Sequence, residues 1–135
     1  MIVAQRLNHD RTICVRVRGM QSTTEFGELG RGLVQAYAKT QRLLILLDWS
    51  ALTGWDNKSA VSDSLRGWTA AASLIERVAI VHAPCWNRQA AVLAAALRIQ
   101  DVEVRSWAIA DLQRALTWLG ENQELARTPA GGLNC

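Results

Sequence analysis

The run "LLILL", Leu43 to Leu47, decides the fold class of this 135-residue chain. All of its residues are apolar, so both faces of the strand that it predicts must be covered by other parts of the protein. Such a strand is typical of the centre of a parallel sheet that carries helices. The stretch that follows, "DWSALTGWDNKSAVSDS" from Asp48 to Ser64, is interpreted as the turn that leads from this strand into a helix.

The residues before this strand predict a hairpin and a helix. The segment "TICVRVR", Thr12 to Arg18, alternates apolar and polar residues with the period of two that indicates a half-covered strand. The polar turn "NHDR" predicts that this strand pairs with residues 2–7. From Thr24 to Lys39 apolar residues recur at helical spacing, although three glycines in this range weaken a helix. The chain is therefore expected to begin with two strands and a helix.

The residues after "LLILL" continue the alternation of helix and strand. The expected elements are a helix with the stripe Val61, Leu65, Trp68, Ala72 and Ile75, a strand over Arg77 to His82, a helix over Asn87 to Arg98, a strand over Val102 to Trp107, and a last helix marked by Ile109, Leu112, Leu116 and Leu119. The predicted order is ββαβαβαβα, an α/β fold with a mixed, mostly parallel sheet of about five strands, about four helices and right-handed crossovers. One domain is expected over residues 1–120, and the aperiodic tail over residues 121–135 is expected to be mobile.

Composition and charge argue against several classes of protein. Thirteen arginines and two lysines are scattered among twelve acidic residues, so no basic stripe for nucleic acid stands out. His9 and His82 offer no metal-type spacing, and no metal or other cofactor is expected. The longest apolar run, Ala90 to Leu97, is far shorter than the roughly 20 residues that span a bilayer. Three cysteines without metal-type spacing and an early charge at Arg6 indicate a cytoplasmic protein.

Two places have the residue types of a catalytic site, and both have a simpler structural explanation. His82 and Cys85 lie where a buried strand leads into a helix, and a helix N-terminus lowers the pKa of a thiol. Neither an oxyanion hole nor an orienting group accompanies the pair, so packing is its favoured role. Asp56, followed by Asn57 and Ser59, is better explained as a helix N-cap than as a general base. The residues therefore do not predict an enzyme.

Six tryptophans are the oddest feature of the composition. Trp68 belongs to a predicted helix stripe and is explained by burial. Trp49, Trp55 and Trp86 fall in two turns that follow strands, at the edge where open α/β sheets bind ligands. These three residues indicate either an apolar corner or a binding surface. The helix with "AAVLAAAL", which is apolar all round, is expected either to be buried or to offer a second face to a partner, a ligand or a membrane.

Three segments together resemble the SpoIIAA-like protein family, which is related to STAS domains. The matching features are the step Gly54-Trp55-Asp56 after the apolar strand, then Ala60 and Asp63, the pair Glu76-Arg77 before a strand, Trp86, and the terminal Ala115 to Leu119. The resemblance covers nearly all of residues 1–120. It implies a small α/β fold with helices packed on a mixed sheet, reminiscent of CRAL-TRIO lipid-transfer domains, and no enzymatic activity.

The resemblance implies two alternative functions. The first is a binding module that holds a small apolar ligand or lipid between the helices starting near Ala60 and Asn87, and that associates reversibly with the inner face of the membrane. The second is a STAS-type module that docks a regulatory protein, in the manner of the anti-sigma-factor antagonists. Those members carry a phospho-acceptor serine directly after an aspartate, but Asn57 follows Asp56 here, and Ser59 stands two residues further on.

Five residues are predicted to contact a ligand of the first kind. They are Trp55, Asp56, Trp68, Trp86 and Leu93. A homodimer is a further expectation, because apolar helices and tryptophans at a surface are often covered by a second copy of the chain. Nucleic acid is not an expected partner.

Overall fold

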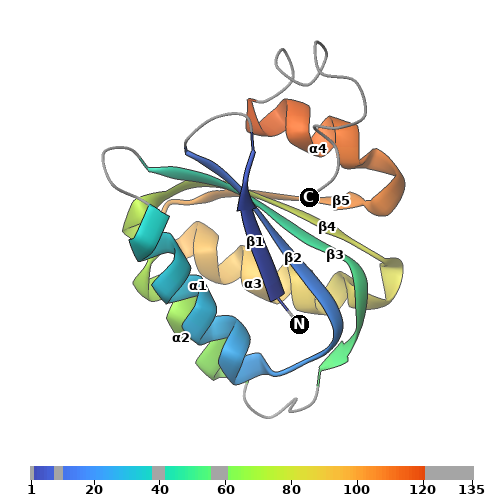
Figure 1. Cartoon of the computed structure of the whole chain (residues 1–135), viewed down its shortest axis with the longest axis horizontal. Helices are drawn as coiled ribbons and strands as arrows, with labels where there is room; N and C mark the ends of the chain where they lie inside the picture. Colours follow the sequence, from blue (N-terminus) through green and yellow to red (C-terminus); the bar gives the residue numbers. More distant parts are fainter. Residues whose placement is uncertain (1, 8–10, 38–41, 56–60, 121–135) are drawn as a thin grey trace.

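The computed structural model describes residues 2–7, 11–37, 42–55 and 61–120, and these residues build a sheet with helices on both faces (Figure 1). The strands are β1 (Ile2–Arg6), β2 (Thr12–Gln21), β3 (Leu43–Trp55), β4 (Ile75–His82) and β5 (Glu103–Ala108). The helices are α1 (Thr23–Tyr37), α2 (Val61–Ala70), α3 (Asn87–Ile99) and α4 (Leu112–Leu119), with short 3-10 turns η2 (Ala72–Leu74), η3 (Pro84–Trp86) and η4 (Ile109–Asp111). The predicted tail over residues 121–135 lies outside the described residues.

The strands follow one another across the sheet in the order β1-β2-β3-β4-β5. The pair β1 and β2 is antiparallel, and the pairs from β2 to β5 are parallel. The predicted element order and the mixed, mostly parallel sheet are therefore confirmed. Because right-handed crossovers that always step in the same direction put their helices on one face, α1, α2 and α3 share a face, and α4 covers the other (Figure 1).

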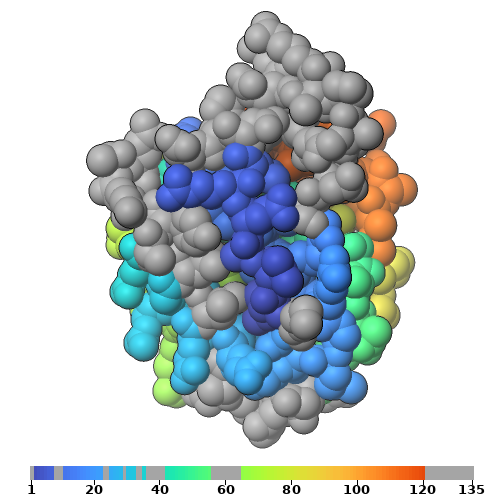
Figure 2. Space-filling view, viewed as in Figure 1, coloured from blue at the N-terminus to red at the C-terminus, as the bar shows by residue number. Residues whose placement is uncertain are grey.

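The strand β3 joins the two layers, as "LLILL" predicted. Leu43, Ile45 and Leu47 belong to the large core, which is the cluster of buried residues between the sheet and α1, α2 and α3. Leu44 and Leu46 belong to the small core, which also contains Ala115, Leu116 and Leu119 of α4. Both faces of this strand are thus covered, which is why none of its five central side chains is polar. β1, at one edge of the sheet, lies on the near surface in Figure 2.

The strand β3 is longer than the sequence indicated. The interpretation of Asp48 to Ser64 as a turn is wrong over its first half, because β3 continues to Trp55. Its partner β2 is also long, and the pairing reaches as far as Gln21 opposite Trp55. Two register shifts in this pairing break the period of two that would have revealed the strand, since each added residue turns the following side chains to the other face. Residues 56–60, including Asp56, lie outside the described residues.

The helix α2 is shorter than its apolar stripe. The helix ends at Ala70, and the last two residues of the predicted stripe belong to other elements, Ala72 to η2 and Ile75 to β4. The amide of Leu74 donates to the carbonyl of Ala71 at 3.0 Å, which closes the tight turn. Both outlying residues are buried in the large core. The stripe therefore follows one core through three elements, and helical spacing alone does not show where the helix ends.

The helices α1 and α2 pack closely because glycines face each other between them. A Cβ atom added at Gly67 would overlap the carbonyl group of Gly27, and one added at Gly30 would overlap the indole of Trp68. These close approaches explain why α1 keeps glycines that weaken a helix. The seam between α1 and α2 is consequently closed by backbone and by one indole ring. None of the helices in the described ranges is long and apolar enough to span a membrane.

Candidate functional site

Four aromatic rings meet at the carboxyl-terminal end of β3 and form what we term the aromatic cluster: Phe26, Trp49, Trp55 and Trp68. Phe26 comes from the first turns of α1, Trp49 and Trp55 from β3, and Trp68 from α2. The ring centroid of Phe26 lies 5.9 Å from that of Trp49, 5.4 Å from that of Trp55 and 5.2 Å from that of Trp68. The centroids of Trp49 and Trp55 are 5.6 Å apart. Phe26 is thus the centre of the cluster.

Three of these four contacts are edge-on. The interplanar angles are 69° for Phe26 and Trp49, 63° for Phe26 and Trp55, and 77° for Trp49 and Trp55. Such contacts contribute about 0.5–1.5 kcal/mol each beyond the area that they bury. The cluster is consequently a stable apolar wall at the end of the sheet where open α/β proteins bind ligands.

Three indole N–H groups of this wall have no hydrogen-bond partner among the described residues. Trp49 and Trp68 expose only 2% and 0% of their surface, and Trp55 is half-buried. Across the described part of the chain, no acceptor bonds to the buried Nε1 of Trp49, Trp55 or Trp68. Buried indole N–H groups usually find a partner, and leaving one unmet costs about 1–3 kcal/mol. An N–H edge that faces a neighbouring ring recovers part of this cost, and an acceptor oxygen from a ligand would recover more.

The other predicted residues approach the same core from the side of α3. The Nε1 of Trp86, in η3, donates to the carbonyl of Leu52 at 3.3 Å, so this indole is satisfied within the fold. Leu93 is buried in the large core, and Trp86 packs against that core from its rim. The structure therefore places Trp55, Trp68, Trp86 and Leu93 around one core, but ring contacts through Phe26 join only Trp55 and Trp68.

Two members of the cluster, Phe26 and Trp49, are not among the residues that the sequence predicts to contact a ligand. The sequence places Phe26 in the helix expected over Thr24 to Lys39, and it places Trp49 with Trp55 and Trp86 in the turns at the binding edge. The available signal is that two large apolar residues, Trp49 and Leu52, lie three residues apart in a stretch without helical spacing. The structure buries both of them. That spacing fits a strand only if a bulge is allowed.

The pair His82 and Cys85 has no catalytic geometry in the structure. His82 is buried at the end of β4, and its Nδ1 donates to the carbonyl of Ala83 at 2.7 Å. Cys85 is a free thiol exposed on η3. Within the described ranges no hydrogen bond joins the two side chains, and no group of three or more His, Cys, Asp or Glu gathers to hold a metal ion. The local backbone contact explains the orientation of His82.

Comparison with known proteins identifies the type of fold. A family model described as SpoIIAA-like matches residues 12–120. An uncharacterised protein of the DUF3478 family with a SpoIIAA-like fold, from Shewanella loihica PV-4, is similar in structure with a TM-score of 0.62 and 22% sequence identity. The similarity covers 88% of this chain and 92% of that one. No curated protein matches the chain.

Proposed function

Because the chain belongs to the SpoIIAA-like family, we propose that it is a binding module that holds a small apolar ligand against the aromatic cluster. The ligand class is an apolar molecule with a hydrogen-bond acceptor, such as a fatty acid or a lipid fragment. The proposal extends to a likeness in function to CRAL-TRIO lipid-transfer domains, which the family resemblance implies. It describes a STAS-like binding module and assigns no catalysis.

One observation carries this proposal. The aromatic cluster contains three buried indole N–H groups to which the described residues supply no acceptor. An apolar wall with a few polar groups is the usual composition of a small-molecule site. A ligand oxygen that reaches the N–H of Trp55, which is half-buried, would supply a bond that the described residues do not make.

The packing of the helices favours entry from the side of α3. The α1 and α2 seam is closed where Gly27 meets Gly67 and where Gly30 meets Trp68. The rim of the large core near α3 instead carries Trp86, which is only partly buried. We therefore place the ligand between α2 and α3, with the aromatic cluster at its inner end.

The substitution Trp55→Phe is expected to weaken ligand binding while leaving the fold intact. Phenylalanine keeps an aromatic ring but removes the N–H donor, so affinity should fall about five- to tenfold, as for the loss of about 1 kcal/mol of hydrogen bonding. Binding is measured by titrating the tryptophan fluorescence with dodecanoic acid and, separately, with its methyl ester. Native mass spectrometry of the purified chain gives the mass of any ligand retained from the cell.

The matched control is Trp118→Phe, which makes the same chemical change in α4, on the other face of the sheet. Its affinity for both probes should equal that of the wild type. The proposal fails if neither probe binds and no mass is retained, or if the two variants bind equally well. Sedimentation with vesicles of phosphatidylcholine and phosphatidylglycerol shows whether the ligand is drawn from a membrane or from solution.

A second candidate, docking of a regulatory protein in the STAS manner, is supported by one exposed side chain. Met20 is 62% exposed and lies opposite Gly54 in the register of β2 and β3, next to Trp55. Exposed methionines are common at adaptable binding surfaces. If a purified partner binds the Met20→Ser variant as well as the wild type, this edge is not its docking site.

A further inference from the structure

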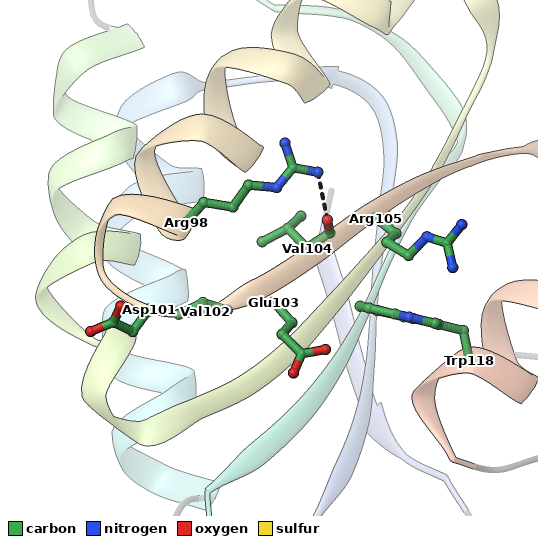
Figure 3. Close-up of a pocket in the computed structure, with 7 residues that line it drawn as sticks. All are labelled: Arg98, Asp101, Val102, Glu103, Val104, Arg105 and Trp118. Carbon is green, nitrogen blue, oxygen red and sulfur yellow. Dashed lines mark hydrogen bonds between the residues drawn. The ribbon is translucent and has the colours of Figure 1, made fainter.

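The edge formed by β5 is open to a partner strand. β5 is the last strand of the sheet, and among the described strands it pairs only with β4. A groove of about 430 Å³ runs along it between α3 and α4 (Figure 3). Its lining residues are Arg98, Asp101, Val102, Glu103, Val104, Arg105 and Trp118. Open strand edges either are protected or pair with another chain.

One hydrogen bond shows which backbone groups face outward. Nη2 of Arg98, at the end of α3, donates to the carbonyl of Val104 at 2.6 Å, as the dashed line in Figure 3 shows. The carbonyl of Val104 therefore points away from β4, while its side chain is buried in the large core. In a strand the N–H and the carbonyl of one residue point to the same side, and those of the next residue point to the opposite side. Val104 and Ser106 thus present the groups that a new strand would meet.

The two charged residues beside Val104 can pair with the same two residues of a second copy of the chain. Glu103 and Arg105 flank Val104 and are both exposed, on the face of the sheet that carries α4. We propose that two copies of the chain pair antiparallel through β5, with Val104 opposite the partner's Val104. This register sets Glu103 opposite the partner's Arg105 and Arg105 opposite the partner's Glu103. Opposite charges placed directly across two strands stabilise their pairing, and a two-fold axis makes each such contact twice.

The exposed face of α3 supplies apolar surface beside this edge. α3 packs against β5, and its solvent side carries Val92 and Ile99, which are 40% and 78% exposed, together with the small residues Ala91 and Ala95. Small side chains allow helices to approach closely. In the dimer α3 would lie along α3 of the partner, which accounts for the second apolar face of a helix that is otherwise buried against the core.

The test reverses the sign of one charge at a time. Glu103→Arg puts like charges across the pair, and so does Arg105→Glu, so each variant alone should dimerise at least about tenfold more weakly than the wild type. When the two variants are mixed, each charge meets its opposite again, and a 1:1 heterodimer should form. Sedimentation velocity over about 1–300 µM measures the dissociation constants, a range that brackets the micromolar affinities of modest interfaces.

The outcomes that overturn the inference are specific. A wild type that stays monomeric over the whole range contradicts it, and so does a mixture of the two variants that remains monomeric. A dimer that neither substitution weakens forms through another surface, and this result also contradicts the inference. Because Glu103 lies 3.4 Å from Nε of Arg77, and Arg105 stacks 5.0 Å from the Trp107 ring, far-UV circular dichroism must show that each variant is folded.

A further variant, Arg98→Ala, is expected to strengthen the dimer. Arg98→Ala frees the outward carbonyl of Val104, so the dimer should become several-fold tighter, because no side chain must be displaced before the strands pair. Arg88→Ala removes an exposed arginine from the other end of α3 and should leave the dissociation constant unchanged. A dimer that Arg98→Ala weakens, or affects no more than Arg88→Ala, contradicts a pairing through Val104.

Discussion

Trp68→Ala is expected to lower the free energy of unfolding by about 3–5 kcal/mol, the usual range for truncating a fully buried aromatic side chain. Trp68 is wholly buried, its ring lies 5.2 Å from that of Phe26, and its indole lies against the α1 backbone at Gly30. Its removal would leave a cavity between two helices that glycines hold close together. Small domains are stable by about 5–15 kcal/mol in total, so this one substitution would remove a large share of the stability.

Urea unfolding followed by far-UV circular dichroism measures this loss, since the signal does not depend on the tryptophan that is removed. The control is Met20→Ala, which truncates an apolar side chain of β2 that is 62% exposed. Its free energy of unfolding should stay within about 0.5 kcal/mol of the wild type, as for most surface substitutions. A loss below about 1 kcal/mol for Trp68→Ala would mean that α1 and α2 close over the cavity, contrary to the packing described here.

Gly67→Ala is expected to destabilise the protein by about 1–3 kcal/mol, the usual cost of overpacking. The added methyl group would overlap the carbonyl group of Gly27, which is backbone and cannot rotate away. The helices would have to separate, and the contact of Trp68 with Gly30 would loosen with them. The expected loss is notable because alanine in place of glycine normally stabilises a helix, by about 0.5–1 kcal/mol.

Gly32→Ala provides the matched comparison for this change. Gly32 also lies in a helix, but an added Cβ atom would meet nothing within 4 Å. The substitution should therefore raise the free energy of unfolding by about 0.5–1 kcal/mol. The same chemical change is thus predicted to have opposite signs at two sites. Equal effects in urea unfolding would show that the contact of α1 with α2 does not decide the role of Gly67.

These stability predictions also separate structure from binding within the aromatic cluster. Trp68 holds two helices together, so its loss would reduce ligand binding through the fold. Trp55 is half-buried at the end of β3, and exchanging its indole for a phenyl ring leaves the α1 and α2 contact untouched. Trp55 is therefore the better residue for testing the ligand, and Trp68 is the better residue for testing the fold.

Much of the fold could be predicted from local patterns. The apolar run from Leu43 to Leu47 indicated a strand covered on both faces, and the structure divides its side chains between the large and the small core. The alternation of Thr12 to Arg18 indicated a strand, and β2 begins at Thr12. Periodicity succeeds here because each residue of a regular strand or helix points in a direction that its own position in the chain determines.

The boundaries of β3 and α2 could not be predicted in this way. β3 runs past Asp48 because β2 is there to pair with it, and α2 ends before Ala72 although the apolar stripe continues to Ile75. In both cases the deciding partner comes from another part of the chain. A bulge in β3 or a tight turn after α2 changes the direction of side chains without changing the composition of the segment.

Local periodicity predicts the order of strands and helices and the burial of the central strand. Which side chains meet depends on how these elements pack together. Phe26, Trp49, Trp55 and Trp68 come from three elements, and they converge because successive right-handed crossovers place α1 and α2 on one face of the sheet. The same arrangement leaves β5 at an edge with Glu103 and Arg105 on either side of Val104. Contacts between distant residues depend on register and handedness across the whole sheet, and no local pattern of residues specifies these.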